Sequence, residues 1–145
     1  MSLATWASNG WLVSHQPSRQ EINDLLGLAQ RDLTDARTAG LSADWRFNIA
    51  YNATLQSATA ALAAAGYRAA REAHHFRILQ SLQFTIGADR KTLSQLDQFR
   101  KKRNIGGYER AGGVSELEVS EMLALARRVH EEVITWLRGN RPELL

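Results

Sequence analysis

The sequence of 145 residues has no cysteine, only two prolines and only ten glycines. The absence of cysteine excludes disulfide bonds, thiolate zinc sites and a cysteine nucleophile. Few prolines and glycines, with abundant alanine, favour long helices over sheets. No apolar run approaches the roughly 20 residues that cross a bilayer, and residues 1–17 lack the cationic and apolar regions of an export signal. We therefore expect a soluble cytoplasmic protein without a membrane partner.

The composition is that of one globular domain, since 44% of the residues are hydrophobic and 23% are charged. Apolar residues recur at helical spacing in several segments, and Ser18 with Glu21 and Ser115 with Glu118 have the spacing of capping boxes that begin helices. The expected helices cover residues 18–36, 42–66, 69–86, 90–103 and 115–139. We predict an N-terminal arm over residues 1–17 that packs in part on a bundle formed by residues 18–145.

These helices predict an all-α fold, an antiparallel up-and-down four-helix bundle with a short extra helix and no strand. Alanines on several faces of the segment 42–66 indicate a helix that is contacted from more than one side. Trp45 and Trp136 are candidates for the core or for a dimer contact, and the core is the preferred placement.

The charge is unevenly distributed along the chain. The formal net charge is only +3, yet residues 68–110 hold ten Lys and Arg against four Asp and Glu, a local net charge of +6. A basic region of this kind attracts phosphate groups. An ordinary solvated face is the alternative explanation.

The strongest functional signal is the basic run Arg100, Lys101, Lys102 and Arg103, followed by Asn104, a Gly-Gly pair and Tyr108. Arg100 and Arg103 are three residues apart, so they share a helix face, and arginine binds phosphate or carboxylate in a bidentate manner. The alternative is that cations at a helix C-terminus complement its dipole, which contributes about 0.3–1 kcal/mol each.

This segment, in its helical setting, resembles the HEPN family of small all-helical proteins, and the resemblance covers most of the chain. Further residues that carry it are Ser18 to Ala36, the run from Gly40 to Ala53, the run from Ala64 to Arg68, and His74-His75. The resemblance implies a homodimer whose cleft gathers polar residues of both copies. Active members are metal-independent ribonucleases, often toxins paired with a nucleotidyltransferase-like antitoxin. Arg103 would hold the phosphate and Asn104 would orient it.

The sequence departs from the family at the position of the proton-transferring histidine, where it has Tyr108. Tyrosine, with an ordinary pKa of about 10, is a poor base at neutral pH, although it can donate a hydrogen bond or stack on a nucleobase. His75 could replace the missing base if its helix faces the same cleft. The alternative for His75 is a hydrogen-bonded histidine in a packed interface.

No metal or cofactor is predicted, because no pair of ligands has metal-binding spacing and no phosphate-binding glycine motif is present. Three functions follow from these observations. The leading one is a homodimer that binds RNA or a nucleotide through Arg103, Asn104 and Tyr108, with Arg100, Lys101, Lys102 and His75 as further phosphate contacts. The others are a ribonuclease with residual activity, and a non-catalytic subunit that binds a partner such as an antitoxin.

Overall fold

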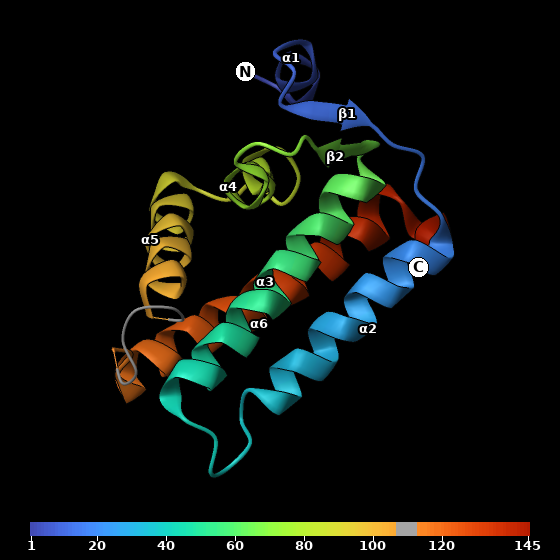
Figure 1. Cartoon of the computed structure of the whole chain (residues 1–145). Helices are drawn as coiled ribbons and strands as arrows, with labels where there is room; N and C mark the ends of the chain where they lie inside the picture. Colours follow the sequence, from blue (N-terminus) through green and yellow to red (C-terminus); the bar gives the residue numbers. More distant parts are fainter. Residues whose placement is uncertain (107–112) are drawn as a thin grey trace.

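The computed structural model describes residues 1–106 and 113–145, and it is mostly helical, with 72% helix and 4% strand. Four helices run alternately down and up the molecule in chain order (Figure 1). They are α2 (Arg19–Asp35), α3 (Ala43–Ala64), α5 (Arg90–Gly106) and α6 (Glu116–Asn140). The short elements are α1 (Leu3–Ser8), β1 (Leu12–Ser14), β2 (Tyr67–Ala69), α4 (His74–Gln80), η1 (Ser81–Phe84) and η2 (Pro142–Leu144). The predicted all-α up-and-down bundle is confirmed.

Helix α3 is the centre of the bundle, and it contacts α2, α4, α5 and α6. Small side chains on every side allow these helices to approach it, because alanine fills little space between two backbones. The alanines that are almost fully buried are Ala50, Ala53, Ala58, Ala60, Ala61, Ala63 and Ala64. The prediction that this helix is contacted from several sides is confirmed.

The two predicted capping boxes differ in the structure. At the start of α6, the Glu118 amide donates to the Ser115 hydroxyl (3.1 Å) and the Ser115 amide donates to the Glu118 carboxylate (3.0 Å), so the box is complete. At the start of α2, the Glu21 amide donates to Ser18 (3.1 Å), but the Glu21 carboxylate binds His15 instead of the Ser18 amide. Glu21 therefore joins the N-terminal segment to α2.

The prediction that the chain has no strands is wrong. Strands β1 and β2 form an antiparallel pair in which Leu12 lies opposite Ala69. Gly66, with φ of +97°, makes the turn between α3 and β2 in a conformation that side chains strongly disfavour. The predicted helix over 69–86 is also wrong in extent. Ala69 is the last residue of β2, and α4 begins only at His74 and is followed by η1.

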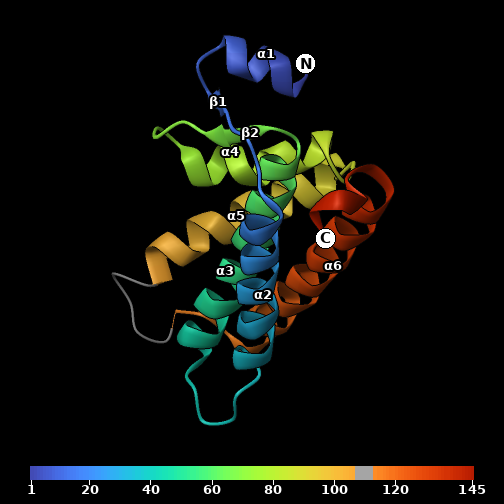
Figure 2. The ribbon, with the colours of Figure 1, turned by 90° about the vertical axis from the view of Figure 1, so that its right-hand side faces the viewer.

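Residues 1–17 pack on the body through aromatic contacts. The buried Trp6 ring lies edge-on to Trp11 and to Phe84, with centroids 5.8 and 5.1 Å away. The guanidinium of Arg77, on α4, lies 3.6 Å from the centre of the Trp11 ring, a cation–π contact. Figure 2 shows α1 and β1 above α4 at one end of the bundle. Residues 1–17 thus contain the defined elements α1 and β1.

The preferred core placement is wrong for Trp45, which is 63% exposed at the start of α3, whereas Trp136 is partly buried against the core. Trp45 lies two residues before the fully buried Phe47, so it points from α3 to the side away from the core. Among the described residues, no helix combines the length and the apolar character that crossing a bilayer requires.

The tight packing around α3 leads to a first prediction. Ala61→Leu inserts three carbons where the side chain is fully buried, so it should destabilise the protein by roughly 1–3 kcal/mol. Urea unfolding monitored by circular dichroism measures the change. Ala124→Leu, on the exposed side of α6, is the matched control and should change stability by less than about 0.5 kcal/mol. Equal effects of the two variants would contradict this account of α3.

Candidate anion-binding site

Arg103 lies in the last turns of α5 and reaches over α3. Its guanidinium carbon is 5.3 Å from the centre of the Tyr51 ring, which α3 presents. The Nε of Arg103 and the hydroxyl of Tyr51 are both buried, and neither has a hydrogen-bond partner within the described part of the chain. Buried polar groups are nearly always satisfied, so two unsatisfied donors side by side point to a missing acceptor.

His75, on α4, borders the same group of side chains. Its ring centroid lies 6.4 Å from that of Tyr51 and 4.4 Å from that of His74. Burial lowers the pKa of His75, and the charges of His74, Arg103 and Arg100 lower it further. His75 is therefore neutral at pH 7, and it is only partly exposed. A neutral imidazole next to two guanidiniums can accept a proton, and an arriving anion would favour its charged form.

The phenol of Tyr51 also keeps its proton. Burial raises its pKa above the ordinary value of 10.0, and Asp97 adds to this, while Arg103 and Arg100 oppose it. At neutral pH the group is therefore an O–H donor. Arg103, Tyr51 and His75, which we call the anion site, offer an acceptor three kinds of donor: a guanidinium, a phenol and, when protonated, an imidazolium.

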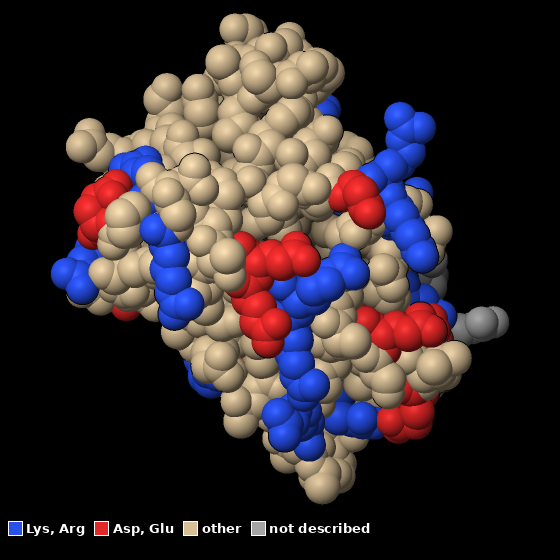
Figure 3. Space-filling model, turned by 180° about the vertical axis from the view of Figure 1, so that it is seen from behind, with Lys and Arg blue, Asp and Glu red and all other residues tan. Residues whose placement is uncertain are grey.

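The other cations of the basic run are paired with carboxylates. The Asp97 carboxylate forms ion pairs with Arg100 and Lys101, at nitrogen–oxygen distances of 2.9 and 3.3 Å. The Lys102 nitrogen lies 3.3 Å from the carboxylate of Glu118 on α6. Basic and acidic side chains are likewise interspersed over the face opposite to that of Figure 1 (Figure 3). Exposed ion pairs are weak and open readily, so these residues can still contribute to phosphate attraction, although Asp97 and Glu118 balance two of the four positive charges of the run.

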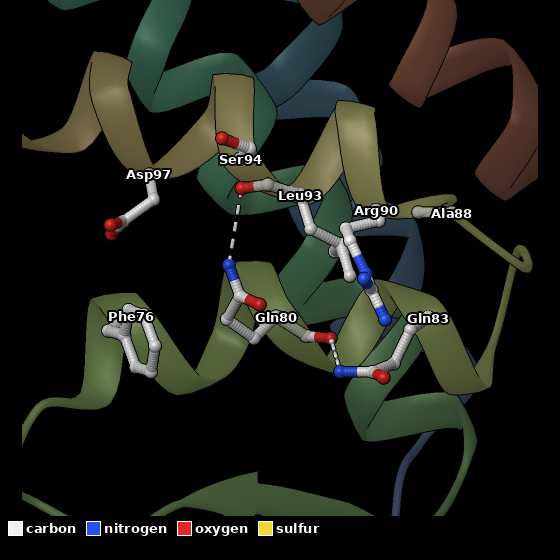
Figure 4. Close-up of a pocket in the computed structure, with 8 residues that line it drawn as sticks. All are labelled: Phe76, Gln80, Gln83, Ala88, Arg90, Leu93, Ser94 and Asp97. Atoms are coloured by element: carbon white, nitrogen blue, oxygen red, sulfur yellow. Dashed lines mark hydrogen bonds between the residues drawn. The ribbon is translucent and has the colours of Figure 1, made fainter.

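A hollow of about 450 Å³ lies between α4 and α5 beside the anion site (Figure 4). Phe76 and Asp97 stand at one end, and both contact Arg100, which lies 5.4 Å from the centre of the Phe76 ring. The Gln80 amide crosses the hollow and donates to the Leu93 carbonyl (3.2 Å). The lining is mainly polar, and it suits sugar or phosphate groups better than a purely apolar ligand.

The structure thus brings together three of the residues singled out in the sequence, Arg100, Arg103 and His75. Asn104 belongs to α5, but its side chain lies outside the described residues, as does all of Tyr108. Tyr51 was missed, because it lies on the apolar stripe of its helix and looks like an ordinary core residue. No sequence signal distinguishes it; only the approach of α5 to α3 reveals it.

No group of three His, Asp or Glu side chains that could hold a metal ion occurs in the parts of the chain that the structure describes. Neither a protein-family model nor a curated protein matches this sequence. The HEPN resemblance accordingly rests on the quoted residues alone and stays a prediction.

The electrostatics of the anion site give a second prediction. Arg103→Gln removes a cation near His75, so the pKa of His75 should rise. It should stay below 6.5, because burial is the largest cause of its depression. NMR titration of the histidine ring protons measures the value. Arg138→Gln, an exposed change on α6, should leave it unaltered. A His75 pKa that is the same in both variants would show that Arg103 does not act on this ring.

Proposed function

We propose that this protein binds RNA, or a nucleotide, with a phosphate group held in the anion site by Arg103, Tyr51 and His75. The observation that carries the proposal is the pair of buried, unsatisfied donors Arg103 Nε and Tyr51 Oη, whose guanidinium carbon and ring centre lie 5.3 Å apart. A phosphate oxygen is a strong acceptor for both groups, and a guanidinium matches two phosphate oxygens at once.

The surroundings of the site support a polymeric ligand. Arg100 lies along the same helix face and leads to the hollow between α4 and α5, where Phe76 offers an aromatic surface. Stacking of a base on an aromatic ring contributes to single-strand binding without sequence preference. Asn104 and Tyr108 belong to the proposed site through the HEPN resemblance only.

We also propose that the protein acts as a homodimer. Two large apolar side chains in the first turns of α3 and α6, Trp45 and Leu117, are 63% and 67% exposed. Each adjoins one member of the ion pair between Arg46 and Glu116, so the two lie near one another. A second copy that covers this apolar surface would bring another anion site close to the first.

Metal-independent RNA cleavage is the second candidate, and the position of His75 favours it. A neutral imidazole can take the proton of a ribose 2′-hydroxyl as that oxygen attacks the adjacent phosphorus. Arg103 would stabilise the negative charge that develops on the phosphoryl oxygens. The bond between phosphorus and the 5′-oxygen of the next nucleotide would break, and that oxygen would take a proton from water. The role that the family gives to a histidine at the position of Tyr108 would thus pass to His75.

A binding experiment tests the leading function. Single-stranded RNA should bind the wild-type protein at low salt with one strand per two chains, and added salt should weaken binding, because phosphate contacts release counterions. Arg103→Ala should weaken binding by at least about tenfold, the loss of one charge-assisted contact. Tyr51→Phe should also weaken binding without loss of stability, since the hydroxyl has no partner to lose. Calorimetry gives the affinity and the stoichiometry.

Arg138→Ala removes an exposed arginine of α6 and is the matched control. If Arg103→Ala and Arg138→Ala bind RNA equally well, the anion site is not the RNA site. A non-catalytic subunit that binds another protein would show no RNA binding in any variant.

Cleavage is tested separately with a labelled RNA in the presence of a chelator. The wild-type protein should cleave slowly, and His75→Gln should reduce the rate by about 10²-fold or more, the usual contribution of a general base. Arg138→Gln, at an exposed position on α6, is the control, and it should leave the rate within a few-fold. RNA binding by wild type without any cleavage would leave the binding function standing and reject the catalytic one.

A further inference from the structure

A second cavity, of about 300 Å³, lies where the N-terminal end of α2 meets α3, β2 and α4. Its lining is mostly apolar, and the residues concerned are Leu55, Leu62, Ala63, Ala69 and Ile78. The volume is at the lower end of the range of small-molecule sites, which are typically apolar with a few polar groups. It is large enough for one planar heterocycle.

The polar groups at this cavity are those of His15, Glu21, Thr59, Tyr67, Arg68 and His74. The Glu21 carboxylate is the only acidic group among them. Its two oxygens accept from His15 Nε2, each at 2.8 Å. Because Nε2 lies equally close to both oxygens, it occupies the side on which a carboxylate accepts two donors at once, and a ligand that binds there displaces it. Thr59 donates its hydroxyl proton to the Leu55 carbonyl (2.7 Å), so its oxygen is also left as an acceptor.

The placement of Glu21 is unusual for its position in the helix. A glutamate three residues after a serine N-cap ordinarily closes a capping box, as Glu118 does at the start of α6. Glu21 has the same spacing from Ser18, yet its carboxylate turns to His15 and lines the cavity. The contact with His15 thus replaces the capping contact of Glu21, and it leaves a carboxylate at the edge of the apolar cavity.

The cavity adjoins the anion site. His74 lines the cavity and His75 borders the anion site, with their ring centroids 4.4 Å apart. On α3, Tyr51 of the anion site and the cavity residues Leu55 and Thr59 follow at intervals of four, so they lie along one helix face. A ligand with a phosphate at one end and a heterocycle at the other could therefore occupy both.

We propose that this cavity binds a purine base, guanine best of all. Guanine presents a ring N–H and an amino group side by side, and these two donors would replace His15 Nε2, which now lies across both oxygens of Glu21. Uracil places a carbonyl on each side of its ring N–H, and those oxygens repel a carboxylate. The apolar lining removes the faces of the base from water, and Arg68 at the edge attracts the phosphates of a nucleotide. The choice of ligand class rests on the proposed RNA or nucleotide function.

Nucleosides, which carry no phosphate, test the cavity without the anion site. Guanosine, adenosine, cytidine and uridine are titrated into wild-type protein with labelled methyl groups, and NMR follows Leu55, Leu62 and Ile78. Guanosine should give saturable shifts of these methyl signals and bind at least about tenfold more tightly than uridine, since a hydrogen-bonding site rejects a ligand that lacks its donors. Arg103→Ala should bind guanosine as wild type does.

Two variants complete the test. Glu21→Gln replaces one carboxylate oxygen with an amide, and it should remove the preference for guanosine. Thr59→Phe fills the cavity from α3, and it should abolish the methyl shifts while circular dichroism shows an unchanged fold. If no nucleoside shifts these methyl signals at millimolar concentration, or if Glu21→Gln keeps the guanosine preference, the purine site is rejected.

The two proposals fail in different ways. Loss of guanosine binding with Arg103-dependent RNA binding intact would reject the purine site alone. Guanosine binding without Arg103-dependent RNA binding would reject the proposed function and leave the cavity as a nucleoside site.

Discussion

The crowding around α3 is the constraint on which the rest of the structure depends. A helix contacted from four directions cannot carry large side chains on all its faces, and α3 meets this requirement with alanine at seven almost fully buried positions. Its few large residues are placed where neighbouring helices leave room. Phe47 packs against Phe99 of α5 and Tyr51 receives Arg103, so the same helix that closes the core also supports the candidate site.

The fold could be predicted from local signals because those signals agree. Serine caps at Ser18, Ser42 and Ser115 begin α2, α3 and α6 as expected, and the alanine pattern identifies the central helix. The strands could not be predicted, since three residues such as Leu12–Ser14 carry no periodicity and gain their hydrogen bonds only from a distant partner. The helix that contains α4 was predicted too long for the same reason, since the residues of β2 have a pattern that also permits a helix.

The candidate site was predicted in part. Arg100 and Arg103 were identifiable because a run of cations is rare, and His75 because histidine is rare in this chain. Tyr51 could not be found, because nothing in a sequence tells a buried phenol with a satisfied hydroxyl from one without. The pairing of Lys102 with Glu118 was equally hidden, since it joins two helices, whereas Lys101 and Asp97 lie four residues apart on one helix. Chemistry that depends on which helices meet is decided at the level of tertiary packing.

The β1–β2 pair has a consequence for the order in which the molecule assembles. It joins Leu12 to Ala69, 57 positions apart, through only three residue pairs. Closing so long a loop costs chain entropy that a short ladder offsets only after the helices are in place. His15 follows directly on β1 and Tyr67 begins β2, so the cavity they line is completed late in folding and is among the first parts to open. A ligand held there would add to the contacts of Trp6, Trp11 and β1 that already hold the N-terminal segment on the body.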